Sequence, residues 1–339
     1  MSHYKATVLN LKNYSTDYYS TVARSLIHSL GISDITWIDN TISMRTSCFF
    51  EHSLNDTIHD IIHQSYAQAI IIHYTKLYRG KPDRRFIGIE FTDYPLLVDS
   101  IYQAPECVRL MAMQRHDSKF PSIKYPRLDA GFFSSNLYYS ESQPTTAWKC
   151  IPAPPYIGNI DQLFFGGTVQ PSSLQRKVIP LLEKHPDVCC LLTSLIFSKE
   201  INGDHMTRIR PYNYMDYLDV AAKYRVHLAL EGTSGFCVRE FDALRMGAPL
   251  IMSPWKFSHR MEPLVDGEHY FAAEYDSNIE IFAERILRRF NEIRHDQKKR
   301  DQIRLNGQQW FEQNCTIPHI TAKIVEWIET AFANTSPLT

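Results

Sequence analysis

The sequence lacks an excess of charge of either sign, which argues against several classes of protein. Its 339 residues include 36 Lys and Arg against 37 Asp and Glu, for a formal net charge of −1. A net field that would attract nucleic acid or an anionic membrane surface is therefore missing. Any phosphate that binds must be held by local groups.

Long apolar runs, disulfide patterns and metal-binding motifs are also missing. No stretch of about 18 apolar residues occurs, and residues 1–5 lack the apolar segment of a signal peptide, so we expect no transmembrane segment and a cytoplasmic location. The seven Cys residues are odd in number and lie mostly in apolar runs, which favours reduced thiols over a secreted disulfide framework. The 14 His residues are scattered without the spacing of a zinc site, so no metal or other cofactor is expected.

The composition that is present, 44% hydrophobic and 22% charged, is typical of a globular protein, and the length favours about two domains. Short apolar runs alternate with amphipathic segments, which is the pattern of parallel sheets covered by helices. In the first half this predicts strands at residues 6–11, 35–38, 69–73, 86–91 and 108–113, the last of which completes the sheet, and helices at 17–30 and 53–66. In the second half it predicts strands at 163–165, 188–195, 226–230 and 249–252, and helices at about 172–184, 214–223, 236–246, 301–314 and 320–333.

Two further patterns define the domains. Residues 118–161 are rich in Pro, Ser and aromatics without a helical period, which indicates the end of one domain and a linker. Between residues 279 and 293, apolar residues recur at three- and four-residue spacing, as on one face of a helix. The predicted class is α/β, with two Rossmann-like domains over residues 1–155 and 156–318 that face a cleft, and a helix over 319–339 that packs back on the first domain.

The most informative segment runs from Leu230 to Pro249. A strand leads into a turn of small residues that opens a helix, and the free amides and dipole of such a helix favour a diphosphate. Arg239 and Asp242 share a face near that end, where a guanidinium can fork onto phosphate and a carboxylate can accept the hydroxyls of a ribose. Further candidate contacts in the turn are Glu231, Ser234 and Gly235. The alternative is an ordinary Arg–Asp pair on the helix surface.

The pattern Arg-x-x-Asp-x-x-x-x-Gly-Ala-Pro resembles the Arg-x-x-Glu-x-x-x-x-Gly-x-Pro signature in the C-terminal domain of GT-B glycosyltransferases. The resemblance implies a GT-B fold in which Arg239 contacts the donor phosphate and Asp242 holds the ribose. Asp in place of Glu shortens the reach by one methylene, which leaves Glu240 or Glu231 as substitutes. It also implies that the second domain binds the nucleotide sugar and the first binds the acceptor.

A second segment, Phe164-Phe165-Gly166-Gly167-Thr168, places two glycines directly after an apolar run. Glycines at the end of a strand let the backbone approach a phosphate or sugar, and Arg176 at the following helix start adds a positive charge. The segment resembles the first strand and loop of the same GT-B domain, also found in exostosin-like and CAP10-like transferases. The alternative is a simple tight turn.

A third segment ends the apolar run Phe86–Phe91 with Thr92, Asp93, Tyr94 and Pro95. A carboxylate at the end of a buried strand is well placed to take a proton from an acceptor hydroxyl. The Phe-Thr-Asp run, about 70 residues ahead of the Gly-Gly-Thr strand, resembles the phage DNA β-glucosyltransferases, inverting GT-B enzymes in which that Asp is the base. A turn or helix-capping role for Asp93 is the alternative.

The sequence therefore predicts a glycosyltransferase that moves a sugar from a nucleotide-sugar donor to an acceptor hydroxyl on a glycan. In the inverting reading, Asp93 is the base, while Arg239, Arg176 and helix amides stabilise the departing diphosphate without a metal. Three alternatives stay open: a retaining GT-B enzyme, a DNA-base glycosyltransferase, and a non-catalytic two-lobed protein that binds sugar nucleotides. Nucleic acid enters only as a possible acceptor, and the near-zero net charge argues against it.

Overall fold

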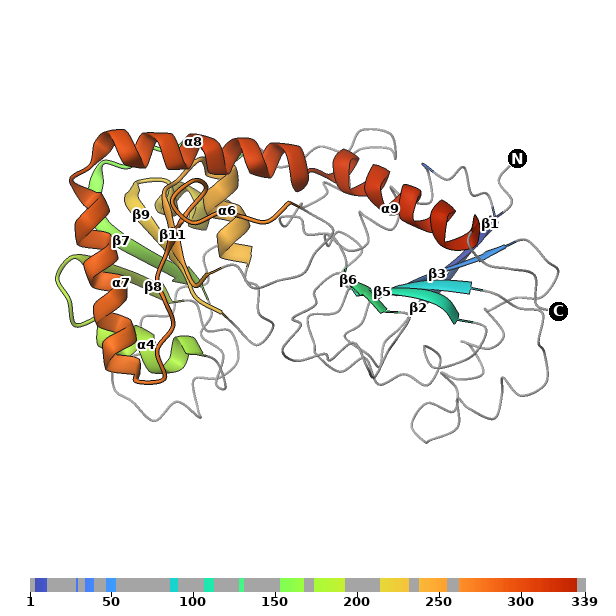
Figure 1. The fold of residues 1–339 in the computed structure, drawn as a ribbon, viewed down its shortest axis with the longest axis horizontal. Helices are drawn as coiled ribbons and strands as arrows, with labels where there is room; N and C mark the ends of the chain where they lie inside the picture. Colours follow the sequence, from blue (N-terminus) through green and yellow to red (C-terminus); the bar gives the residue numbers. More distant parts are fainter. Residues whose placement is uncertain are drawn as a thin grey trace. The chain divides into compact units, whose positions relative to one another are not determined.

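The structure, a computed structural model, describes residues 4–10, 29, 34–39, 47–52, 86–90, 107–112, 128–130, 153–167, 174–192, 214–231, 238–254 and 262–333. Internal contacts divide the chain into two compact units, and each carries a β-sheet (Figure 1). Unit 1 comprises residues Met1–Ile151, Ser258–Met261 and Thr316–Thr339. Unit 2 comprises residues Pro152–Phe257 and Glu262–Cys315.

The sheet of unit 1 has six described strands in the order β2-β1-β3-β4-β5-β6. The strands are β1 (Tyr4–Asn10), β2 (Asp34–Asp39), β3 (Ser47–His52), β4 (Phe86–Glu90), β5 (Cys107–Ala112) and β6 (Leu128–Ala130). β3 pairs antiparallel with β1 and β4, and the other neighbours pair in parallel. Every strand except β3 therefore runs in the same direction, so the carboxyl ends of β4 and β5 lie at the same edge.

Two expectations for this sheet are wrong. The sheet is mixed rather than parallel because of β3, a short strand that the apolar pattern did not predict. The strand expected at 108–113 does not complete the sheet, since β6 pairs beyond it. β6 lies inside the stretch 118–161 that indicated the end of one domain and a linker, and its three residues are too few to show a periodicity.

Several expected elements of this half fall outside the described residues. They are the helix at 17–30, of which only the helical Ser29 is described, the helix at 53–66 and the strand at 69–73.

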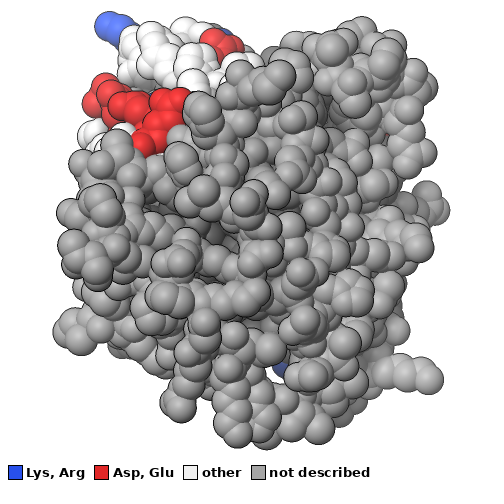
Figure 2. Space-filling view, turned by 90° about the vertical axis from the view of Figure 1, so that its right-hand side faces the viewer, with Lys and Arg blue, Asp and Glu red and all other residues white. Residues whose placement is uncertain are grey.

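The helix α9 (Ile317–Ala333) belongs to unit 1, where it contacts β5. Its buried positions, spaced as on one face of a helix, are Ile320, Thr321, Ile324, Trp327 and Ile328. Glu326 and Glu329 are exposed. Figure 2 shows acidic side chains gathered in the described part of one face of the chain.

The sheet of unit 2 has five described strands, all parallel, in the order β11-β10-β9-β7-β8. The strands are β7 (Ile160–Gly167), β8 (Val188–Leu192), β9 (Tyr224–Ala229), β10 (Leu250–Met252) and β11 (Phe271–Ala272). Between successive strands lie α4 (Leu174–Leu182), α5 (Tyr214–Ala221) and α6 (Val238–Met246). The predicted α/β class with a parallel sheet is confirmed for this unit, and the expected strands and helices are present with shifted ends.

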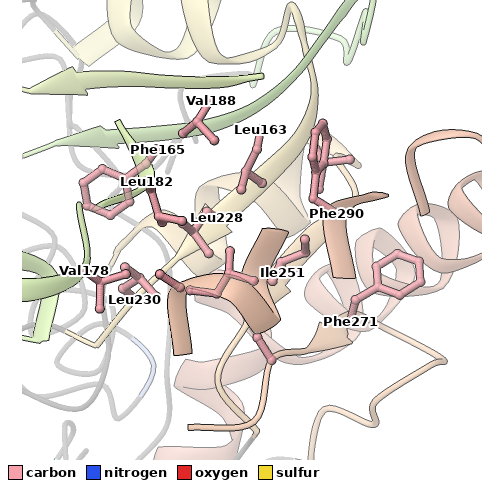
Figure 3. Packing of buried hydrophobic residues seen from close by; sticks show 14 of the residues in the cluster. Leu163, Phe165, Val178, Leu182, Val188, Leu228, Leu230, Ile251, Phe271 and Phe290 are labelled. Carbon is pink, nitrogen blue, oxygen red and sulfur yellow. The ribbon is translucent and has the colours of Figure 1, made fainter. Parts of the chain in front are cut away.

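Side chains of β7 alternate between two apolar layers, one on each face of the sheet. Leu163 and Phe165 pack in a cluster with α4 and with α7 (Ile279–Arg294), as Figure 3 shows. Phe164 points to the other face, where it packs with Leu218 of α5 and Met246 of α6. Helices therefore cover both faces, which is the arrangement that buries a parallel sheet.

Two long helices complete the unit, and each has an N-cap that the sequence supplies. The Asn278 side chain accepts hydrogen bonds from two backbone N–H groups of the first turn of α7. Asp296 caps α8 (Gln297–Asn314) in the same way, which is why α8 begins four residues before the predicted start at 301. The predicted apolar face over residues 279–293 is confirmed, because the buried residues of α7 include Phe282, Ile286, Phe290 and Ile293.

A glycine inside α8 sets how closely that helix approaches its neighbours. A Cβ atom on Gly307 would lie 2.8 Å from the backbone oxygen of His269 and 2.8 Å from Cδ2 of Leu244 on α6. We expect Gly307→Ala to lower the free energy of unfolding by about 1–3 kcal/mol from overpacking, although alanine is the better helix former by about 1 kcal/mol. Urea unfolding checks this against Gln309→Ala, an exposed position on α8 that should change stability by under about 0.5 kcal/mol. Equal stability of the two variants would contradict the tight packing of α8 on α6.

Candidate functional site

The order in which unit 2 adds its strands places a switch point between β7 and β9. β8 lies on one side of β7 and β9 on the other. The helices that follow the two strands pack on opposite faces, since α4 belongs to the cluster of Phe165 and α6 to the cluster of Phe164. In open parallel sheets, ligands bind beyond the carboxyl ends of the strands at such a point. The candidate site is therefore the region where β7 and β9 end.

At the end of β7 lie the two glycines that the sequence singled out. Gly167 has φ +122°, a conformation that favours glycine, and a Cβ atom there would lie 2.8 Å from Nε and Nη2 of Arg239. A Cβ atom on Gly166 would lie 2.5 Å from Cε2 of Tyr217. At both positions the absence of a Cβ atom leaves room for the close approach of a neighbouring side chain to the backbone.

Arg239 is the side chain that the Gly167 position accommodates. It lies in the first turn of α6, and its Nε donates a hydrogen bond to the backbone oxygen of Gly166. Its Cζ lies 4.6 Å from the ring centroid of Phe165, which is fully buried. A cation over an aromatic face is attracted by about 0.5–2 kcal/mol. The guanidinium is thus fixed from two sides at the carboxyl end of β7.

Three carboxylates considered for ribose binding differ in exposure. Glu240 and Asp242 on α6 are each only 3% exposed, and neither is without a partner. Glu231, two residues beyond the end of β9, is half-buried. The alternative reading of Arg239 and Asp242 as a surface pair is therefore wrong, and Glu231 is the most accessible of the three carboxylates.

The other predicted site residues are only partly placed. Arg176 is exposed in the first turn of α4. Asp93, Thr168, Ser234 and Gly235 lie outside the described residues. Asp93 follows the last residue of β4 by three positions.

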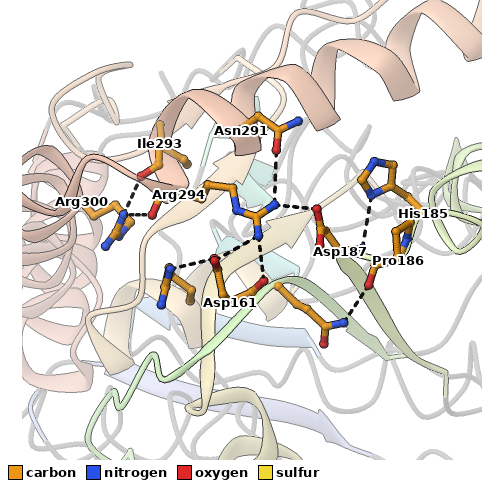
Figure 4. Close-up of polar contacts among 10 residues, drawn as sticks. Asp161, His185, Pro186, Asp187, Asn291, Ile293, Arg294 and Arg300 are labelled. Atoms are coloured by element: carbon orange, nitrogen blue, oxygen red, sulfur yellow. Dashed lines mark hydrogen bonds and ion pairs between the residues drawn. The ribbon is translucent and has the colours of Figure 1, made fainter.

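The opposite ends of β7 and β8 are held by ion pairs (Figure 4). Arg294, in the last turn of α7, reaches Asp187 with Nη1 at 2.6 Å and Asp161 with Nη2 at 3.0 Å. Arg225 of β9 pairs with Asp161 at 2.8 Å. Burial acts to raise the pKa of Asp161, but the hydrogen bond from Arg294 and the charge of Arg225 outweigh it and lower that pKa. This network lies away from the glycine turn and ties α7 to the sheet.

Two contributors to the site were not predicted from the sequence. Phe165 was recognised as a strand residue but not as the ring beneath Arg239, and Gln175 on α4 was not singled out at all. Phe165 contacts Arg239, which lies 74 positions further along the chain. Gln175 donates a hydrogen bond to the backbone oxygen of Leu230, 55 positions away. Contacts between residues so far apart in the sequence leave no local pattern from which they could be predicted.

No protein-family model matches the chain, and no curated protein matches it. Solved structures do. The chain is similar to a glycosyltransferase from Rickettsia africae ESF-5, with 13% identity over 97% of this chain and 98% of that one and a TM-score of 0.49. It is also similar to the Anabaena protein HepE in complex with UDP and glucose, with 16% identity over 66% of this chain and 64% of that one and a TM-score of 0.44.

A third similar structure is the C-terminal domain of a group 1 family glycosyl transferase from Francisella tularensis, with 18% identity over 46% of this chain and 86% of that one and a TM-score of 0.32. The Rickettsia and Francisella proteins are both described as glycosyltransferases. At these identities the likeness concerns the fold alone.

Two absences hold for the described residues. None of the helices described has the length and hydropathy needed to cross a membrane. Within the same residues, no three His, Cys, Asp or Glu side chains gather into a group that could hold a metal ion.

Proposed function

We propose that this protein is a GT-B glycosyltransferase that moves a sugar from a nucleotide-sugar donor to a hydroxyl of a saccharide acceptor. The observation that carries the proposal is the position of Arg239. Its guanidinium is held by the Gly166 oxygen and the Phe165 ring at the switch point of a parallel sheet, beside the start of α6. A fixed cation at that point suits the diphosphate of a nucleotide.

The donor is proposed to lie across the ends of β7 and β9. Arg239 and the amides that open α6 would bind the diphosphate, and the glycine turn lets the ligand approach the backbone of β7. The resemblance gave the ribose to Asp242, yet the 3% exposure of that side chain favours Glu231 as the carboxylate that meets the ribose hydroxyls.

The chemical step is proposed to be a single displacement with inversion. Asp93 removes the proton of the acceptor hydroxyl, the oxygen forms a bond to the anomeric carbon, and the bond from that carbon to the diphosphate oxygen breaks. Negative charge develops on the leaving diphosphate, where Arg239 stabilises it electrostatically without a metal ion. The support for Asp93 is its place in the sequence, three residues after the last residue of β4.

The proposal is tested first by nucleotide binding. Thermal-shift screening against UDP, GDP, ADP and TDP identifies the tightest diphosphate, because a ligand that binds the folded state raises the midpoint. We expect Arg239→Ala to weaken that diphosphate by roughly 10- to 100-fold in calorimetric titration, since a charge-assisted bidentate contact is lost. The matched control is Arg245→Ala at the other end of α6, which should change affinity by less than about threefold. Equal affinities of the two variants would remove Arg239 from the site.

The ribose carboxylate is identified by comparing the diphosphate with inorganic pyrophosphate. Glu231→Gln is expected to weaken the nucleoside diphosphate about tenfold and to leave pyrophosphate binding unchanged, because only the nucleotide carries ribose hydroxyls. Asp242→Asn is the paired variant. If it alone shows this selective loss, the ribose contact belongs to Asp242, as the motif implied.

A further inference from the structure

A buried glutamine joins the two strand ends on which the proposed donor site stands. Gln175 lies in the first turn of α4 and is 1% exposed. Its Nε2 donates a hydrogen bond of 2.8 Å to the backbone oxygen of Leu230. Leu230 follows the last residue of β9 and directly precedes Glu231.

This contact is the counterpart of the one that Arg239 makes. Arg239 belongs to the helix after β9 and reaches the backbone oxygen of Gly166 at the end of β7. Gln175 belongs to the helix after β7 and reaches the backbone just beyond the end of β9. Each helix therefore sends one polar side chain across the switch point to the other strand.

The residue type at position 175 is not explained by packing. Val178, Ile179 and Leu182 occupy the same face of α4, and each is 0% exposed. An apolar side chain at position 175 would continue that face, whereas a buried amide must be compensated by hydrogen bonds. The bond to the Leu230 oxygen supplies compensation and constrains the chain where it leaves β9.

We infer that Gln175 is a positioning residue of the donor site: it fixes the backbone at Leu230, and thereby Glu231, against the start of α4. The inference rests on the proposed function, since it concerns the same site. Gln175 acts on the nucleoside side of the donor through Glu231. The diphosphate is bound by Arg239, which Gln175 does not position.

The test compares two glutamines that make the same kind of bond. Gln162, near the start of β7, donates from Nε2 to the backbone oxygen of Pro186 at 2.9 Å. We expect Gln175→Met to weaken the tightest of UDP, GDP, ADP and TDP about tenfold and to leave inorganic pyrophosphate unchanged. Gln162→Met should change neither affinity. Circular dichroism at the titration temperature establishes that each variant is folded.

A second variant gives a readout that depends on the bond itself. In Gln175→Glu an ionised carboxylate cannot donate to the Leu230 oxygen, whereas the protonated acid can. We therefore expect the affinity of this variant for the diphosphate, relative to wild type at the same pH, to recover about tenfold between pH 8 and pH 5.5. Burial raises the pKa of such a carboxyl above its ordinary value.

The outcomes distinguish failure of the proposed function from failure of the positioning role of Gln175. If wild type binds none of the diphosphates, the proposed function fails and the role of Gln175 with it. If wild type binds but Gln175→Met matches Gln162→Met, or if Gln175→Glu shows a flat ratio to wild type across the pH range, the positioning role alone is overturned. Loss of pyrophosphate together with the nucleotide would also overturn it, because the effect would then reach the phosphate side.

Discussion

Replacing Asp93 by asparagine is expected to lower the rate of sugar transfer by about a thousandfold while leaving nucleotide affinity within about twofold of wild type. An amide cannot take the proton of the acceptor hydroxyl, so the attacking oxygen stays a poor nucleophile. The donor contacts proposed for Arg239 and Glu231 are untouched by the change. The measurement is release of the nucleoside diphosphate from its sugar donor, with added saccharide or water as the acceptor.

The control for this variant is Asp99→Asn, the same substitution six residues further along the chain. It should transfer at the wild-type rate. Proton NMR of the product adds an independent readout, since direct displacement inverts the configuration at the anomeric carbon. Retention of configuration would assign the chemistry to a retaining GT-B enzyme, in which Asp93 has no such role. Normal transfer by Asp93→Asn would show that Asp93 is not the base.

Prediction from sequence succeeded where a pattern is local and repeated. The alternation of apolar runs and amphipathic segments predicted β7, β8, β9 and β10 and the helices between them, because in a parallel sheet each strand is buried on both faces and reads as an apolar run. The apolar period of α7 predicted its buried face for a similar reason. Both signals come from neighbours in the chain.

The elements that were missed have short or weak local signals. β6 has three residues and β11 has two. Segments this short do not show the alternation of side chains that marks a strand. β3 joins the sheet by pairing with β1 and β4, and its antiparallel direction is a property of those partners. Pairing across tens of residues is decided by tertiary structure, not by the residues of the strand alone.

The candidate site likewise combines local signals that the sequence shows with contacts that only the fold creates. Glycines after a strand and an arginine at a helix start are local signals, and the sequence alone indicates both. That a Cβ on Gly167 would collide with Arg239 follows only from the fold, since 72 residues separate the two positions. The burial of Asp242 is equally invisible to a motif, which records the type of a residue and its spacing but not what covers it.

The second large expected effect is a loss of stability at low pH, and it arises from a histidine on β9. His227 of β9 is buried among apolar groups, with the Phe164 ring centroid 5.5 Å from its own. Its Nε2 lies 3.0 Å from the backbone oxygen of Ala221. A carbonyl only accepts, so Nε2 carries the proton of the neutral ring and donates. Burial lowers the pKa of His227 to about 4, and the hydrogen bond to Ala221 offsets only part of that shift.

Because the folded-state pKa of His227 lies below its ordinary value of 6.5, the unfolded chain binds more protons between those two values, and stability falls as the pH falls through that window. From pH 7 to about pH 4 we expect this residue to remove about 3 kcal/mol from the free energy of unfolding. Hydrogen exchange of peptides from β9 across a urea series, repeated at each pH, measures this change in the free energy of unfolding.

His227→Gln can still donate to the Ala221 oxygen but does not titrate, so its unfolding free energy should lose that part of the pH dependence. The exposed His295→Gln should keep it, and parallel pH profiles of wild type and His227→Gln would show that the ring is charged in the folded protein after all.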